Sequence, residues 1–503
     1  MPNMLHDALF APLAKRKTPL LHLANGRTIS GGAFHDLVLR YAAALVSLGL
    51  APGDRLAVQI AKSPEALALY GAAVAAGVVF LPLNTAYTPA EVAYFVGDSG
   101  AKVLVGDGGR TDALQSVATA AGARFLTMDA DGSGSFADIA ALQAGEFRPV
   151  DRGPEDLAAF LYTSGTTGRS KGAMLTHENL LSNAGALVRE WRFTADDVLL
   201  HALPIFHTHG LFVASNVVLL SGGSMIFLPS FRVEEIIAVL PQATSMMGVP
   251  TFYTRLLDDP RFDRDLTRHM RLFTSGSAPL LAETHIGFEA RTGHRILERY
   301  GMTETNMNTS NPYDGERRAG TVGFPLPGVE LRITDPDTGK ILSQGEPGMI
   351  EVRGPNVFRG YWRMPEKTKE ELREDGFFIT GDIGVIDADG YVSIVGRQKD
   401  LIITGGYNVY PKEVETIIDE HPQVLESAVF GLPHPDFGEA VACVVVVQKG
   451  AHIDLAELDA SLANSLARFK QPKAIFLADE LPRNTMGKVQ KNLLREAHRG
   501  HFG

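Results

Sequence analysis

The sequence contains little cysteine, no long uninterrupted apolar run and no excess of positive charge. Its one cysteine, Cys443, excludes an internal disulfide and a zinc site built from cysteines. Cys443 lies in the apolar run 441–447, which is typical of a buried strand, so we expect an unreactive thiol in the core. The formal net charge of −11 argues against a nucleic-acid-binding surface but allows local basic patches that bind phosphate.

Segments that would place the chain in a membrane are also missing. The most apolar window, 66–83, is divided by Gly71, Gly77 and Pro82, and it predicts a helix, a turn and a buried strand. The first residues lack the basic start and the long apolar centre of a signal peptide. We therefore expect a cytoplasmic protein with no membrane partner.

The length and the patterning of the chain predict an α/β fold in more than one domain. At 503 residues the chain exceeds what one hydrophobic core usually supports. Residues 1–330 alternate helical and strand patterns, which predicts α/β layers with mainly parallel strands. Residues 331–398 predict a β-rich subdomain of short strands, and 399–503 predict a small α+β domain. The main expected elements are helices 34–48, 411–420 and 455–467 and strands 55–60, 101–105, 157–161 and 401–403.

A dense cluster of glycines, hydroxyls and cations spans 161–172, with the sequence LYTSGTTGRSKG. It follows the strand pattern 157–161 and precedes a helical pattern that begins near Thr176. Glycines let the backbone curl so that several N–H groups point at one anion, and the hydroxyls and cations supply further donors. The spacing is G-x-x-G-x-x-K, which differs from a Walker loop. The cluster predicts a loop that binds the phosphates of a nucleotide.

This loop resembles the YTSGTTGxPKG loop of the acyl-adenylate-forming enzymes, which include acyl-CoA synthetases, luciferases and peptide-synthetase adenylation domains. The chain departs from that pattern only at Ser170, where proline is usual. The resemblance covers nearly all of the sequence. Further similar segments are 300–304 (YGxTE), 360–362 (Gly-Tyr-Trp), 379–382 (ITGD), 396–400 (GRxKD) and 482–488 (PRTxxGK, with Asn484-Thr485 where the family has a threonine). The resemblance implies an N-terminal adenylation domain, 1–398, and a small mobile C-terminal domain, 399–503, which rotates about the hinge Lys399.

The resemblance also implies sites for ATP, Mg²⁺ and CoA. The residues implied for ATP are Thr163, Ser164, Gly165, Thr166, Thr167, Gly168, Lys171, Ser277, Ala278, Pro279, Tyr300, Gly301, Thr303, Asp382, Arg397 and Lys488. The implied catalytic residues are Thr303, Glu304 and Lys488. Thr163 and Glu304 are the implied Mg²⁺ ligands, and hard oxygen donors suit that ion. Gly405, Gly406 and Tyr407 are implied to line the passage for CoA.

The chemistry that the resemblance implies has two steps. A carboxylate attacks the α-phosphate of ATP and expels pyrophosphate, and the thiol of CoA then attacks the acyl-adenylate. Because two anions must meet in the first step, cations are needed, and Lys171, Lys488 and Mg²⁺ are the candidates. The charge of Lys488 could also be removed by a lysine acetyltransferase and restored by a deacetylase.

Three histidines, His201, His207 and His209, lie within nine residues. They invite a metal site, but no cysteine or carboxylate is interleaved, so a zinc site is disfavoured. Their segment resembles the family's PLFHxxG segment, which implies that His207 lies near the floor of the acyl pocket. A histidine there, rather than an acid, disfavours an amino-acid substrate.

Arg299 indicates which carboxylic acid is the substrate. The family commonly has a small residue at this position, directly before YGxTE. A buried unpaired guanidinium is costly, so an anion should meet it, and the neighbouring Glu298 should point to the opposite face of an extended backbone. We therefore expect Arg299, aided by His207 and Ser277, to bind the second carboxylate of a small dicarboxylic acid, namely malonate, with methylmalonate as a second substrate.

Two other functions remain open at this point. One is a fatty or aromatic acyl-CoA synthetase that takes a monocarboxylic acid. The other is a non-catalytic adenylate-binding protein. The presence of Lys488, Glu304 and Asp382 argues against that second alternative.

Overall fold

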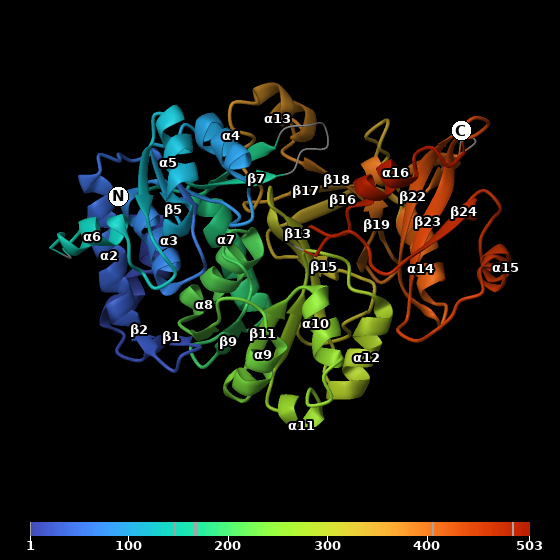
Figure 1. Cartoon of the computed structure of the whole chain (residues 1–503), viewed down its shortest axis with the longest axis horizontal. Helices are drawn as coiled ribbons and strands as arrows, with labels where there is room; N and C mark the ends of the chain where they lie inside the picture. Colours follow the sequence, from blue (N-terminus) through green and yellow to red (C-terminus); the bar gives the residue numbers. More distant parts are fainter. Residues whose placement is uncertain (1, 145, 164–169, 405–406, 485–486, 503) are drawn as a thin grey trace. The chain divides into compact units, whose positions relative to one another are not determined.

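The computed structural model describes residues 2–144, 146–163, 170–404, 407–484 and 487–502 (Figure 1). The chain divides into two units. The first contains Met1–Glu330 and Val352–Phe378, and the second contains Leu331–Glu351 and Ile379–Gly503. Most of the β-rich segment is therefore grouped with the C-terminal part of the chain. These two units are groups of residues in mutual contact, whereas the boundary expected at residue 398 and the hinge at Lys399 concern a rotation between domains. Both therefore stay predictions.

The first unit contains a six-stranded sheet with the order β6-β5-β3-β4-β7-β8. Its strands are β3 (Arg55–Gln59), β4 (Val79–Pro82), β5 (Val103–Gly106), β6 (Arg124–Thr127), β7 (Leu157–Thr163) and β8 (Lys171–Thr176). All neighbours are parallel except β7 and β8. The window 66–83 forms α3 (Pro64–Ala76), a turn at Gly77 with φ of 68°, and β4, which confirms the expected helix, turn and strand.

The same unit contains a nine-stranded sheet with the order β15-β14-β13-β12-β11-β9-β10-β1-β2. Its strands are β1 (Pro19–Leu23), β2 (Thr28–Ser30), β9 (Val198–His201), β10 (Ser224–Phe227), β11 (Ser245–Gly248), β12 (Leu272–Ser275), β13 (Leu297–Met302), β14 (Asn306–Ser310) and β15 (Phe324–Pro325). The strands from β1 through β10, β9, β11 and β12 to β13 run parallel, and both edges are antiparallel. The mainly parallel α/β layering is thus confirmed.

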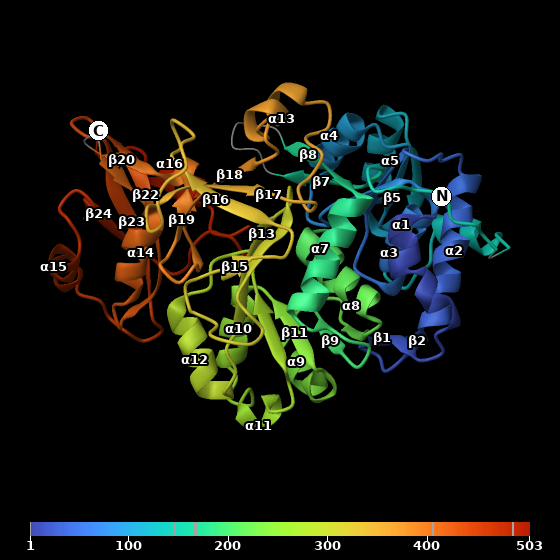
Figure 2. The same ribbon diagram turned by 180° about the vertical axis from the view of Figure 1, so that it is seen from behind.

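Helices cover both sheets of the first unit. They are α1 (Met4–Leu9), α2 (Gly31–Ser47), α3, α4 (Pro89–Ser99), α5 (Thr111–Ala120), α6 (Ser135–Ala141), α7 (His177–Glu190), α8 (Asn216–Ser221), α9 (Val233–Val239), α10 (Pro250–Leu257), α11 (Arg264–Thr267), α12 (Ala282–Thr292) and α13 (Pro365–Glu371). Thr176 caps α7, as the sequence predicts, and α7 packs against β8 of one sheet and β14 of the other (Figures 1 and 2). None of the helices in the described ranges has both the length and the apolarity to span a membrane.

The second unit contains two smaller sheets. One has the order β16-β17-β18-β19, and the other has β21-β20-β23-β22 with β24 beside β23. The strands are β16 (Glu330–Thr334), β17 (Gly348–Arg353), β18 (Phe378–Ile386), β19 (Val392–Arg397), β20 (Ile402–Thr404), β21 (Tyr407–Val409), β22 (Val424–His434), β23 (Gly438–Val447) and β24 (Ala474–Ala478). The helices are α14 (Pro411–Asp419), α15 (Leu455–Ser465) and α16 (Lys491–His498). Cys443 is buried on β23, and burial raises the pKa of its thiol, so the expected core thiol is confirmed.

An aromatic cluster forms much of the core beside the nine-stranded sheet. Phe288 of α12 packs edge-on against Tyr253 and Phe273, with ring centroids 5.4 and 5.0 Å apart. All three side chains are buried. This cluster fixes α12 against the strands that carry the candidate acyl pocket.

We expect Phe288→Ala to lower the free energy of unfolding of the first unit by about 3–5 kcal/mol, because it removes a fully buried ring and leaves a cavity. Urea denaturation followed by tryptophan fluorescence measures this change. Ile286 lies on the same helix and is 62% exposed, so Ile286→Ala should change the free energy by less than about 0.5 kcal/mol. Equal losses in the two variants would contradict the packing described for α12.

Candidate active site

Arg299 lies at the carboxyl edge of the nine-stranded sheet. It stands on β13, next to β12, and the loop that leaves β12 begins at Gly276. The Arg299 side chain is 3% exposed, and within the described ranges its Nε and Nη2 have no hydrogen-bond partner. A Cβ at residue 276 would lie 2.3 Å from the Arg299 Cζ, so the guanidinium occupies the space that this glycine leaves. Burial lowers the pKa of Arg299 to about 9, which keeps it cationic at neutral pH.

Glu298 faces away from Arg299, as alternation along a strand requires. Its Oε1 lies 3.6 Å from Nδ1 of His285 on α12. The expected separation of these neighbours is therefore confirmed, and Glu298 does not neutralise the guanidinium.

His209 and Ser277 lie beside this arginine. His209 begins a π-helical turn, His209–Ser215, and its Nδ1 is 3.2 Å from the Ser277 hydroxyl. Ser277 has a φ of 72°, a left-handed conformation that is uncommon outside glycine and that re-aims its side chain. Burial, followed by the charge of Arg299, lowers the pKa of His209, so it is neutral at pH 7. The sequence selects His207 and misses His209, although the short spacing of the histidines is a visible hint.

His207 is mostly enclosed as well, and burial lowers its pKa to about 4. Its Nε2 is buried without a hydrogen-bond partner in the part of the chain that the structure describes. His201 has a different role, because its Nδ1 lies 2.9 Å from Lys62 Nζ and its Nε2 lies 2.9 Å from the Gly210 carbonyl oxygen. His201 therefore holds the start of the π-helical turn. Over the described ranges, no group of three or more His, Cys, Asp or Glu is arranged to hold a metal ion.

A cavity of about 400 Å³ adjoins the segment Pro204–Phe206 in the first unit. Lys62 lines it, and its ammonium donates a hydrogen bond to the His201 carbonyl oxygen at 2.8 Å. Burial lowers the pKa of Lys62. The cavity combines apolar walls with Lys62, Asp107 and Arg110, and the sequence does not reveal it because its lining comes from separate strands and loops.

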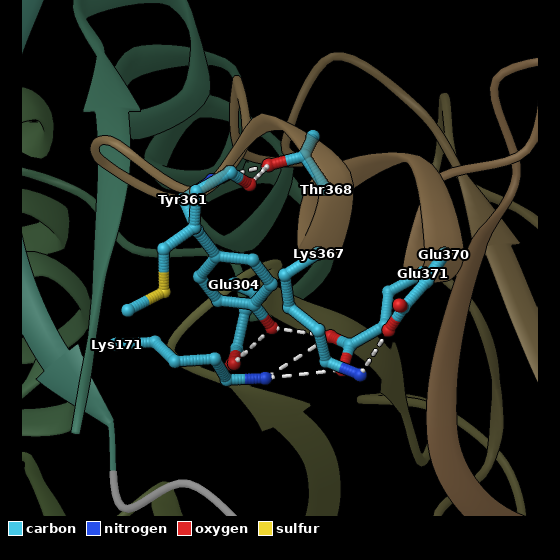
Figure 3. A network of polar contacts seen from close by, with 8 residues as sticks. Lys171, Glu304, Tyr361, Lys367, Thr368, Glu370 and Glu371 are labelled. Atoms are coloured by element: carbon cyan, nitrogen blue, oxygen red, sulfur yellow. Dashed lines mark hydrogen bonds and ion pairs between the residues drawn. The ribbon is translucent and has the colours of Figure 1, made fainter. Parts of the chain in front are cut away.

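Lys171 and Glu304 meet in a polar network around Tyr361 (Figure 3). The Tyr361 hydroxyl lies 2.9 Å from Glu304 Oε1 and 2.6 Å from Glu371 Oε2. The Lys171 ammonium donates to both Glu371 oxygens, at 3.0 and 3.3 Å. Glu304 is buried, and this burial raises its pKa. The structure thus connects the expected residues Lys171 and Glu304 through Tyr361 and Glu371. No sequence pattern indicates a role for Glu371.

The residues expected to hold Mg²⁺ provide hard oxygen donors. Glu304 supplies a buried carboxylate, and the buried Thr163 hydroxyl has no hydrogen-bond partner within the described ranges. Two such donors fit an ion that takes its remaining ligands from phosphate and water.

Several expected site residues lie outside the described residues. They are Ser164, Gly165, Thr166, Thr167 and Gly168 of the phosphate loop and Gly405 and Gly406 of the expected CoA passage. Tyr407 is described, and its ring stacks on Phe469 with centroids 4.7 Å apart. Ala278 and Pro279 continue the loop that contains Ser277.

The expected YGxTE segment forms the end of β13 and the turn into β14. Tyr300 pairs with Thr309 across the two strands. Only glycine fits at position 301, because the Cβ of any other residue would lie 1.8 Å from the Asn306 carbonyl oxygen. Thr303 and Glu304 follow in the turn between β13 and β14, and Glu304 is buried there.

In the second unit, Asp382, Arg397 and Lys488 form one electrostatic cluster. Asp382 and Arg397 are paired residues of β18 and β19, with Oδ1 and Nε 3.0 Å apart. Burial, followed by the charge of Arg397, lowers the pKa of Lys488 to about 8, and Asp382 opposes that shift. Burial also lowers the pKa of Lys399. Three residues expected at one nucleotide site are therefore close enough to influence one another.

The sequence matches two family models. The model described as AMP-binding enzyme matches residues 12–362, and the model described as AMP-binding enzyme C-terminal domain matches residues 413–488. The first model alone matches more than half of the chain, and residues 363–412 lie between the two matches.

Relatives and solved structures agree with these matches. A probable CoA ligase of Humulus lupulus is 38% identical over 459 residues, covering 84% of this chain and 76% of that protein. The malonate–CoA ligase of Arabidopsis thaliana is 36% identical over 482 residues, covering 89% and 79%. The crystal structure of ATP-bound MatB from Rhodopseudomonas palustris superimposes with a TM-score of 0.98 at 58% identity and covers both chains completely.

The lowered pKa of Lys488 makes a pH-dependent prediction. Its reaction with an amine-specific reagent, followed by peptide mass spectrometry, should reach half its maximal rate near pH 8. Since this pKa is below that of an unfolded lysine, the native state holds fewer protons between the two values, and stability should rise with pH across that window. Arg397→Gln should move the half-maximum to higher pH, because it removes a nearby positive charge. An unchanged profile in that variant would contradict the cluster.

Proposed function

Because the chain belongs to the AMP-binding enzyme family, we propose that it is an ATP-dependent ligase that joins malonate to CoA through a malonyl-AMP intermediate. Pyrophosphate and AMP are the other products. Methylmalonate is the second substrate in this proposal. The relatives named as malonate–CoA ligases support the choice of acid.

The observation that carries the proposal is the buried, unpaired guanidinium of Arg299. A cation that is removed from water needs an anionic partner, and the described residues around it provide none. A carboxylate of the substrate meets this need through two parallel N–H···O bonds. A monocarboxylic acid would leave the guanidinium unpaired and would compete with it for space, so specificity follows from attraction and exclusion together.

His209 and Ser277 complete the proposed carboxylate site. In this proposal His209 carries its proton on Nδ1 and donates to the Ser277 hydroxyl, 3.2 Å away, so that the hydroxyl donates its own proton to the same carboxylate. A neutral His209 adds a hydrogen-bonding group without adding a second positive charge. His207 remains a proposed member of the pocket.

In the first proposed step, the free carboxylate of malonate attacks the α-phosphorus of ATP and the bond to pyrophosphate breaks. Lys171 and Lys488 supply positive charge, and Thr303 donates to the α-phosphate. Asp382 and Arg397 are proposed to bind the ribose, with Tyr300 against the adenine. Mg²⁺, held by Glu304 and Thr163, would neutralise phosphate charge when bound.

In the second proposed step, the CoA sulfur attacks the acyl carbon and AMP leaves. Gly405, Gly406 and Tyr407 are proposed to border the pantetheine passage, and Lys399 is the proposed hinge between the two half-reactions. Acetylation of Lys488 by a lysine acetyltransferase would remove its charge and stop the first step. The proposed location is the cytoplasm, where ATP and CoA are available.

Arg299→Ala should lower kcat/KM for malonate by about two to three orders of magnitude, because one partner of a buried ion pair is lost. Pyrophosphate release with a panel of acids measures this effect. Propionate and butyrate should lose little, and their turnover also reports that the variant is folded. Arg295 is exposed and paired with Glu289, so Arg295→Ala should change malonate activity less than about twofold. Wild-type preference for butyrate over malonate would refute the dicarboxylate proposal.

Lys488→Ala should slow malonyl-AMP formation by at least about a hundredfold, because a cation that stabilises charge in the transition state is lost. Thioester formation from supplied malonyl-AMP should be largely retained. Single-turnover assays separate the two half-reactions. The exposed lysine of the same unit, Lys449, provides the control variant Lys449→Ala, which should behave as wild type. An equal loss in both half-reactions would contradict the assigned role.

A further inference from the structure

Glu371 is an unexpected residue at the end of a helix. It is the last residue of α13, where the negative end of the helix dipole disfavours a carboxylate. Three groups compensate for this position: the ammonium groups of Lys171 and Lys367, both 3.0 Å from Oε1, and the hydroxyl of Tyr361. Helix stability therefore does not explain why a carboxylate occupies this position.

The contact with Lys171 is not required to hold α13 in place. The Tyr361 backbone N–H donates to the Thr368 hydroxyl at 2.9 Å, and that hydroxyl donates to the Met364 carbonyl oxygen at 3.0 Å. Lys367 pairs with Glu371 within the helix itself. Figure 3 shows the Thr368 contact at the backbone of Tyr361, whereas Lys171 and Lys367 both reach Glu371 near the Tyr361 hydroxyl. The long-range pair thus serves Lys171 rather than the helix.

Lys171 has little capacity left for a further anion. Its side chain is 12% exposed, its ammonium donates to both oxygens of Glu371, and it lies 4.1 Å from the centroid of the Tyr361 ring. An ammonium has three donors. A phosphate can therefore make its full contact with Lys171 only by displacing the Glu371 carboxylate.

We propose that Glu371 is a positioning residue that holds Lys171 in the nucleotide-free enzyme and competes with the phosphates of ATP for its ammonium. This inference rests on the proposed function, since it takes Lys171 as a phosphate ligand. The pair neutralises a poorly solvated cation while the site is empty, and ATP binds by exchanging one anion for another. Glu371 consequently sets the nucleotide affinity without contacting the nucleotide.

The test is ATP affinity in Glu371→Gln, measured by isothermal titration calorimetry with Mg²⁺ and without acid. The amide keeps the shape of the side chain and an acceptor for Tyr361 but removes the charge that competes with phosphate. We expect the Kd for ATP to fall roughly twofold to fivefold, the size of effect expected for a partly exposed ion pair. KM for malonate should be unchanged. A damaged fold would weaken ATP binding, so a gain in affinity separates the proposal from a structural defect.

Two further variants fix the origin of the effect. Glu370 is the neighbouring residue of α13, pairs with Lys367 and is 63% exposed, so Glu370→Gln should leave the Kd unchanged. In a Lys171→Met background, Glu371→Gln should not change the Kd for ATP, because the ammonium for which Glu371 and phosphate compete is absent. An equal or higher Kd in Glu371→Gln, or the same gain in the Lys171→Met background, would overturn the inference alone. Failure of the wild-type protein to bind ATP would overturn the proposed function as well.

Discussion

The guanidinium of Arg299 lies over Gly276 at the carboxyl edge of a parallel sheet, enclosed and without a protein anion among the described residues. Burying a charge in this way costs free energy unless a partner arrives. Its neighbours do not offset this cost, because Glu298 faces His285 on the other side of the strand and His209 is neutral. In the proposed function, a carboxylate of the substrate pairs with this guanidinium and thereby selects which acids bind well.

The structure stabilises the other cations that the proposed function uses in different ways, each within its own unit. Lys171 is paired with Glu371 and covered by Tyr361, so its charge is neutralised locally. Lys488 lies beside both Asp382 and Arg397, and its pKa is lowered to about 8. Near that pH, about half of the protein molecules carry its positive charge. A reaction that joins two anions needs positive charge during the reaction, whereas the empty enzyme must tolerate that charge without ligands. Pairing, pKa lowering and an enclosed unpaired cation are three solutions to this one problem.

Much of the fold follows from local pattern. The window 66–83 predicts α3, a turn and β4 because glycines and β-branched residues change the periodicity within it. The strand β8 is not evident from the sequence, since six residues with mixed polarity become a strand only by pairing with β7. The helix α13 is hidden for a related reason: it is short, polar and held by contacts with Tyr361. Such elements depend on partners that are distant in the sequence.

The sequence by itself predicted a glycine-rich loop for phosphates and an acid after a threonine, and it determined that the arginine of an extended segment has its acidic neighbour on the opposite face. Those features depend on residue type and on the two-residue period of a strand. Only the tertiary structure decided that His209 meets Ser277 and that Lys171 meets Glu371, which is 200 residues away. The physical reason is that contacts between side chains on separate elements are set by packing and register, and local periodicity contains neither.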